Sequence, residues 1–243
     1  MIIRDKMIFC LAVITGSMLG QPPNPQENWK ALIGHGVASF LHGQYGESIA
    51  VFQRAVDLNA DDPIPHLYLG IAWQAQFVPG SQSTTEGDQA AAQYRRAIEL
   101  DAANWPALVL LGQLARDRGN FDEARSWYQK ALQLDPANAD TWVALGALAW
   151  RRFQTPVSPQ VLDQGISDLR GAVSLDPHHE FAMMFLDALY RQRGDSATAA
   201  EWRQQAENER GDTSNSVLRW PPPLAGTYQI IRDMASADRK SVV

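Results

Sequence analysis

The sequence predicts an all-α protein built from five consecutive helix pairs. Three observations lead to this prediction: a period of 34 residues, apolar residues at helical spacing within each period, and helix-breaking residues at recurring places. Residues 105–138 contain the complete pattern, and related stretches precede and follow them. A repeated unit of this length indicates that one helix pair is stacked on the next along the chain.

The two helices of one unit can be traced in residues 105–138. Leu108 and Ala115 are seven residues apart, a spacing that places them on one face of a first helix. Ala124, Tyr128 and Ala131 follow steps of four and three and form the corresponding face of a second helix. We expect these two faces to pack against each other.

Glycine and proline mark the crossing and the ends of these helices. Gly112 is small where the two helices cross, beside the large side chain of Tyr128. Gly119 is expected to end the first helix, because glycine tolerates the backbone conformation of a C-terminal cap. Pro136 is expected to end the second helix, because proline has no N–H to donate.

The same frame recurs in five units, at residues 29–62, 63–104, 105–138, 139–179 and 180–213. The second and fourth units are longer, and each carries an insertion between its two helices, near residues 78–88 and 152–159. The Pro, Gly, Ser and Thr residues of both insertions are typical of loops. Equivalent insertions emerge on the same side of a repeat array. They are either tolerated loop growth or loops that flank a binding face.

The residue types in this frame resemble those of the tetratricopeptide repeat (TPR), as Trp105, Gly112, Tyr128, Ala131 and Pro136 illustrate. The resemblance implies a right-handed superhelical solenoid, in which each repeat buries its apolar surface against its neighbours. The 243 residues then form one elongated array rather than two globular domains. The resemblance also implies a surface that binds other proteins.

The resemblance assigns the concave side to positions two, five, nine, twelve and thirteen of each unit, which we call the first-helix face. These positions also include Leu41 and Ile64. Either the face forms a groove that accepts an apolar peptide or helix, or positions five and nine are buried between neighbouring units and bind nothing. The candidate partner-binding residues are Ile33, Val37, Phe40, Leu67, Ile71, Val109, Gln113, Arg116, Val143, Trp150, Arg151, Met184 and Arg191.

The sequence lacks the common catalytic and cofactor-binding patterns. There is no P-loop, no dinucleotide-binding glycine pattern and no HExxH pair of histidines. His178, His179 and Glu180 are adjacent at a predicted turn, where consecutive side chains diverge and do not converge on a tetrahedral ion. We therefore expect no enzyme activity, no cofactor and no metal.

The net charge of −6 and the sequence pI of about 5.3 argue against a nucleic-acid surface, which needs a basic stripe. The leading functional prediction is a non-catalytic scaffold for a protein or peptide partner in the bacterial cell envelope. The alternative is a structural subunit of an envelope assembly that self-associates end to end.

Residues 1–20 resemble a secretory signal peptide. Arg4 and Lys6 precede an apolar run at residues 7–14, which is too short for a good transmembrane helix. We therefore expect a periplasmic or secreted protein with residues 21–28 as a linker and no membrane span after signal removal; an uncleaved anchor is the alternative. Cys10 is the single cysteine, so the mature chain would depend on packing rather than on disulfides.

The C-terminal end departs from the repeat pattern. The last unit has Asp187 where the other units have glycine and Arg203 at the aromatic position, as a polar terminal cap requires. Residues 214–243 form a proline-containing tail in which residues 221–223 are three consecutive prolines, typical of polyproline II. The tail either folds back on the array, docks on a partner or remains unstructured.

Overall fold

The computed structural model describes residues 28–80, 84–151 and 158–212. Within these ranges the regular structure consists of ten α-helices and no strand. The predicted signal peptide, nearly all of the linker and the C-terminal tail lie outside the described residues. The helices are α2 (Trp29–Leu41), α3 (Tyr45–Leu58), α4 (Pro63–Gln76), α5 (Thr85–Leu100), α6 (Trp105–Asp117), α7 (Phe121–Leu134), α8 (Ala139–Arg151), α9 (Pro159–Leu175), α10 (Glu180–Arg193) and α11 (Ser196–Asp212).

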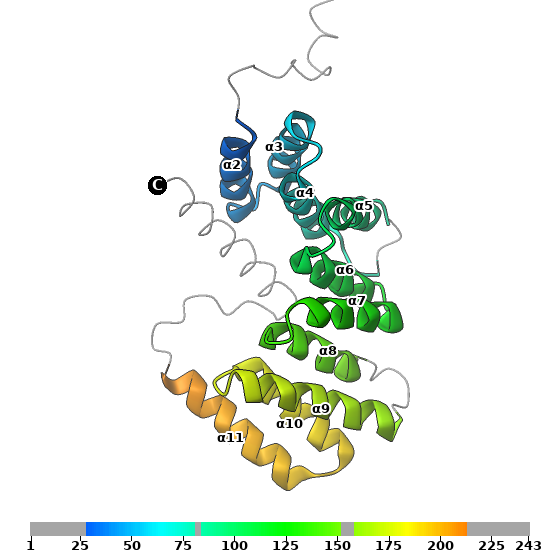
Figure 1. Ribbon diagram of the computed structural model, residues 1–243. Coiled ribbons are helices and arrows are strands. Elements are labelled where there is room, and N and C mark those ends of the chain that lie inside the picture. The colour runs from blue at the N-terminus through cyan, green and yellow to red at the C-terminus, as the bar shows by residue number, and fades with distance from the viewer. Residues whose placement is uncertain (1–27, 81–83, 152–157, 213–243) are drawn as a thin grey trace, which may run out of the picture.

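The helices pair in chain order and stack into a solenoid. The most extensive contacts join α2 with α3, α4 with α5, α6 with α7, α8 with α9 and α10 with α11. The first helices α2, α4, α6, α8 and α10 also contact one another in sequence. The array therefore runs from α2 at one end to α10 and α11 at the other, as Figure 1 shows. The all-α repeat fold that the sequence predicts is confirmed.

Glycine allows the two helices of a unit to approach closely. A Cβ atom built on Gly112 would lie 2.4 Å from the ring of Tyr128, much closer than Cβ atoms approach their neighbours in proteins. The predicted contact between these two positions is thus confirmed. The corresponding pairs in the other units are Gly36 with Phe52, Gly70 with Tyr94 and Gly146 with Leu169.

The helix ends follow from local chemistry. Gly43, Gly119 and Gly194 follow first helices with φ values of +76°, +81° and +87°, a left-handed conformation that glycine adopts without strain. Gly119 therefore ends its helix as predicted. At the N-termini, the Asp62 side chain accepts a hydrogen bond from the backbone N–H of Ile64 at 2.9 Å, which satisfies a donor that the helix itself cannot pair.

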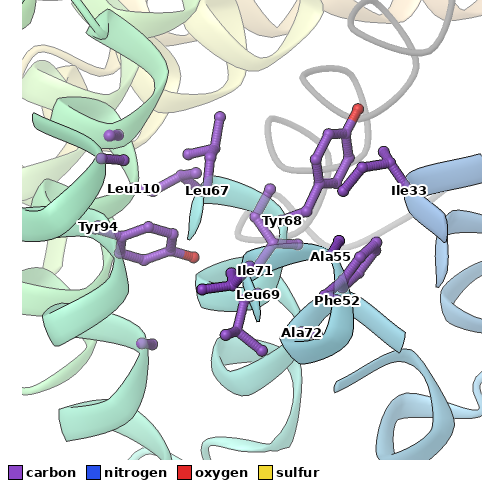
Figure 2. Close-up of a cluster of buried hydrophobic side chains, with 14 of the residues drawn as sticks. Ile33, Phe52, Ala55, Leu67, Tyr68, Leu69, Ile71, Ala72, Tyr94 and Leu110 are labelled. Atoms are coloured by element: carbon purple, nitrogen blue, oxygen red, sulfur yellow. The ribbon is translucent and has the colours of Figure 1, made fainter. Parts of the chain in front are cut away.

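The hydrophobic core is continuous along the array. One cluster extends from Leu32 in α2 to Leu114 in α6, and Figure 2 shows its central part around Phe52, Tyr68 and Tyr94. The rings of Phe52 and Tyr68 join the first two units at a centroid distance of 5.4 Å. Partly buried tryptophans connect this cluster to the following ones. Contact between neighbouring units therefore supplies the burial that a single helix pair lacks.

The length and apolar character of the described helices bear on whether they could span a membrane. None of them combines enough length with enough apolar character to cross a bilayer.

Candidate functional site

The structure buries most of the candidate residues of the first-helix face. Val109 and Val143 belong to core clusters and are 6% and 7% exposed. Both residues occupy position five of their units, and there the side chains are buried between neighbouring units rather than lining a groove. The buried candidates are Ile33, Phe40, Leu67, Ile71, Val109, Gln113, Arg116 and Val143.

The remaining candidates reach the surface. Trp150 and Met184 are each 41% exposed, Val37 is half-buried and Arg191 is exposed. Arg151 is the last residue of α8, and its side chain lies outside the described part of the structure.

Exposed apolar side chains are concentrated on the first-helix face. Among the described residues, seven large hydrophobic side chains are exposed. Four of the seven occupy positions of this face: Leu41, Ile64, Trp150 and Met184. They come from four different first helices, α2, α4, α8 and α10. We call these four residues the apolar set.

The C-terminal half of this face is the better defined half. The ring of Trp150 in α8 meets the ring of Phe185 in α10 edge-on, with centroids 5.7 Å apart. Met184, Ala188 and Arg191 follow steps of four and three along α10 and share one side of that helix. This surface therefore combines an aromatic ring and a flexible thioether, and it ends at a cation.

A buried ion pair lies near the middle of the face. The Arg116 guanidinium approaches the Asp117 carboxylate at 3.0 Å, and both side chains are about one-tenth exposed. Burial disfavours the charge of Arg116, whereas Tyr128 and the partner Asp117 favour it, and the net effect raises the Arg116 pKa. The guanidinium therefore stays charged and held by its neighbour.

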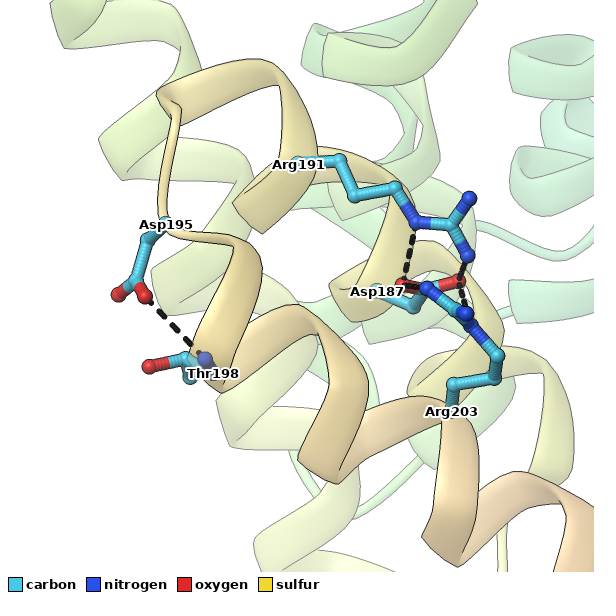
Figure 3. A network of polar contacts seen from close by, with 5 residues as sticks. All are labelled: Asp187, Arg191, Asp195, Thr198 and Arg203. Carbon is cyan, nitrogen blue, oxygen red and sulfur yellow. Dashed lines mark hydrogen bonds and ion pairs between the residues drawn. The ribbon is translucent and has the colours of Figure 1, made fainter.

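A second network fixes Arg191 at the end of the face (Figure 3). The Asp187 carboxylate accepts hydrogen bonds from Arg191 Nε at 2.7 Å and from Arg203 Nη2 at 3.2 Å. Burial raises the pKa of Asp187, but the two guanidinium groups outweigh it and hold the pKa below its ordinary value. The sequence marks Asp187 and Arg203 separately as departures from the repeat pattern and does not indicate that they meet. The signal that could have shown the contact is their position, because Asp187 corresponds to Gly112 and Arg203 to Tyr128, two residues that touch in the third unit.

The sequence did not indicate a further buried carboxylate, which lies between α7 and α9. Asp168 is 3% exposed, accepts a hydrogen bond from Gln164 at 2.8 Å and lies 3.7 Å from the Arg125 guanidinium. Burial raises the pKa of Asp168 despite these two partners. Both contacts are structural, because Asp168 lies in a second helix and not on the first-helix face.

One insertion is tied to the array at its C-terminal edge. Arg118, which follows α6, donates a hydrogen bond to Asp88 in α5 at 2.6 Å, and its guanidinium lies 5.8 Å from the centre of the Phe77 ring. Residues 81–83 and 152–157 of the two insertions lie outside the described ranges. That the insertions flank a binding face stays a prediction.

The adjacent histidines at the α9–α10 turn engage different partners. Nδ1 of His178 is 3.0 Å from Glu209, and Nε2 of His179 is 3.0 Å from Asp140. Within residues 28–80, 84–151 and 158–212, no three His, Cys, Asp or Glu side chains are grouped to hold a metal ion. The candidate site that the described residues define best is the first-helix face.

An array of helix pairs with an apolar first-helix face defines a helical-repeat protein. A family model described as "TPR repeat" matches residues 112–151. The match places a tetratricopeptide repeat in residues 112–151, and the five helix pairs of the structure share the frame of that repeat. No curated protein matches the sequence.

Solved structures with the same architecture include pilF of Pseudomonas aeruginosa, with 15% identity, a TM-score of 0.63 and coverage of 86% of each chain. MamA from Desulfovibrio magneticus RS-1, residues 41 to the end, is 18% identical with a TM-score of 0.62, covering 77% of this chain and 97% of MamA. Another MamA structure is 15% identical with a TM-score of 0.59, covering 79% and 98%. At such identities the likeness concerns the fold alone.

Proposed function

We propose that this protein is a non-catalytic scaffold that binds an apolar peptide or helix of a protein partner along its first-helix face. The observation that supports the proposal is the apolar set, whose four members come from four different first helices. Exposed apolar residues that cluster on one face are typical of interaction sites, whereas scattered single residues are not.

The chemistry of the face fits such a partner. Aromatic residues, Met and Arg are enriched in protein interfaces, and Trp150, Met184 and Arg191 lie together at the C-terminal half of the array. Met adapts its shape to different apolar surfaces. Arg191 is oriented by Asp187 and is still exposed, so it can border the apolar segment.

The experiment compares two pairs of substitutions with similar starting exposure. Trp150→Glu with Met184→Glu alters the apolar set, whereas Leu134→Glu with Leu175→Glu alters exposed residues of second helices, at 46% and 44% exposure. Affinity capture from an envelope extract should retain a protein on the native chain and on the second variant and lose it on the first. Equal retention by both variants contradicts the proposal.

Glutamate at Val109 and Val143 is unsuitable for this test. Both side chains are buried in core clusters, where an unpaired carboxylate destabilises the array. Loss of capture by such a variant would report loss of fold.

We further propose that the scaffold is exported, to the periplasm or beyond. The charged and apolar pattern of residues 1–20 supports this proposal. N-terminal sequencing of the protein from fractionated cells tests it: a chain that starts near residue 21 in the exported fraction supports export, and an intact chain in a membrane fraction supports the uncleaved anchor.

Self-association is the second candidate, and one feature favours it. The first helix α2 exposes Ala31, Gly34, Ala38 and Leu41, and its charged residue in the range 29–41 is Lys30 at the start. A terminal repeat normally carries a polar outer face. Sedimentation velocity over a range of concentrations tests this candidate, because a size that stays monomeric throughout contradicts it.

A further inference from the structure

The stretch of the first-helix face between Ile64 and Met184 has a definite length. Ile64 belongs to α4 and Met184 to α10, three first-helix steps apart in the array. Neighbouring packed helices lie about 8–10 Å apart, so this stretch measures about 25–30 Å. Between its ends the buried Arg116 is already paired with Asp117. The face therefore suits a mainly apolar helix and does not need an acidic partner for Arg116.

One segment of this chain has the required pattern. Leu224, Tyr228, Ile231 and Ala235 follow steps of four, three and four, which places them on one side of a helix. Gln229 and Asp233 fall on the other side, together with Ile230. A helix over residues 224–240 would be about 25 Å long at 1.5 Å per residue, which matches the stretch from α4 to α10.

The charges of the segment and the array are complementary. Residues 224–240 contain three basic and two acidic residues, a net charge of +1, and residues 213–243 together carry +2. Because the whole chain carries −6, residues 1–212 carry −8. Opposite net charges favour association of the segment with the array over its separation.

The described chain ends close to the first-helix layer. Glu209, near the end of α11, contacts His178 in the turn that leads into α10. In a repeat array, the residues after a second helix lead into the next first helix, so residue 213 begins where a sixth first helix would start. The prolines at 221–223 prevent α11 from continuing directly into the segment.

From these observations we propose that residues 224–240 bind the first-helix face of the same chain from α4 to α10 and cover Ile64, Trp150 and Met184. The connection of about a dozen residues gives the segment a high effective concentration at that face. A partner must then displace the segment before it binds. A segment docked in nine of ten molecules weakens partner binding about tenfold. This regulatory role rests on the function proposed above, whereas the docking itself does not.

Photo-cross-linking in the full chain tests the docking. The substitution Tyr228→p-benzoylphenylalanine places a reactive group on the apolar side of the segment, and the irradiated monomer is isolated and mapped by mass spectrometry. We expect cross-links within one chain to peptides of α4, α6, α8 or α10. Adding Ile231→Asp should remove them, whereas the matched control Gln229→Asp, which adds the same charge on the other side, should keep them.

Three outcomes overturn the docking: no cross-link to the array, cross-links confined to second helices, or cross-links only between two copies. The substituted residues follow α11, so equal hydrogen-exchange protection of the second helices α5, α7 and α9 in all variants confirms that the array is folded. Because the experiment contains no partner, its failure leaves the capture result of Trp150→Glu with Met184→Glu intact. Conversely, failed capture leaves the cross-linking result standing.

Discussion

Asp187 and Arg203 form an ion pair where each of the other four units packs a large side chain onto a glycine. Arg203 Nη2 lies 3.2 Å from Asp187 Oδ1. At the corresponding place in the third unit, a Cβ on Gly112 would lie 2.4 Å from the Tyr128 ring. The last helix pair is therefore held at this crossing by a polar contact that remains stable beside solvent, as the end of an array requires.

The first prediction concerns this pair. We expect Asp187→Ala and Arg203→Ala each to destabilise the last unit, and the double variant to lose less than the sum of both. Because the Arg203 side chain is 46% exposed, solvent screens the pair and the coupling should be about 0.5–1 kcal/mol. Hydrogen exchange of α10 and α11 amides measures it locally, which suits a repeat protein whose unfolding need not be two-state.

A control and a contrary result define this test. Glu201→Ala changes an exposed residue of α11, the helix that also carries Arg203, and should show no coupling with Asp187→Ala. Fully additive effects of Asp187→Ala and Arg203→Ala would show that the two charges do not stabilise the crossing together.

The second prediction concerns the glycine crossings. Gly112→Ala forces its new methyl group against the buried Tyr128 ring and should lower the free energy of unfolding by about 1–3 kcal/mol. Gly34→Ala is the matched control, because Gly34 is also helical but has no atom within 4 Å of the added Cβ. It should stabilise the protein by about 0.5–1 kcal/mol. Urea unfolding of both variants checks this, and equal effects would contradict the crossing geometry.

The repeat frame predicted much of this architecture, and particular residues show why. Gly112, Tyr128 and Gly119 could be assigned because each role depends on spacing within one unit. The burial of Val109 and Val143 could not, because it depends on how closely neighbouring units approach. A period gives the side of a helix on which a residue lies but not the distance to the next repeat.

Contacts between units and contacts of the insertions could not be predicted from the sequence either, because the period does not fix distances between units. Arg125 and Asp168 belong to different units, and Asp88 meets Arg118 across a unit boundary next to an insertion. Neither pair has a fixed spacing that a repeat pattern could indicate. Asp187 and Arg203 were visible as substitutions, and only the packed helices showed that their side chains meet.

The third prediction is acid sensitivity of the last unit. The pKa of Asp187 is lower in the folded chain than the ordinary aspartate value of about 3.9. A depressed folded pKa contributes stability that is complete above the unfolded pKa and is lost as the pH falls through the folded pKa. Wild type should therefore lose its advantage over Asp187→Ala below about pH 4. Hydrogen exchange of α10 and α11 at pH 3 to 6 measures this, and a constant difference would contradict it.

The fourth prediction has the opposite sign, because burial raises the pKa of Asp168. A raised folded pKa means that the charged carboxylate lowers stability above that pKa, and the loss disappears as the pH falls below the unfolded pKa. Asp168→Asn removes the charge and keeps an oxygen that can accept from Gln164. Arg125 is left unpaired, but its side chain is 27% exposed and can be hydrated.

We therefore expect Asp168→Asn to unfold at pH 7 within about 1 kcal/mol of wild type or to be more stable, as replacement of buried ion pairs often is. As the pH falls, the free energy of unfolding of wild type should rise relative to that of Asp168→Asn. At Asp187 the sign is opposite, because wild type there loses stability relative to Asp187→Ala in acid. Urea unfolding of both proteins between pH 3 and 7 provides the comparison. A variant destabilised by more than about 2 kcal/mol at pH 7, with the difference shrinking in acid, would show that the ion pair with Arg125 outweighs the burial of Asp168.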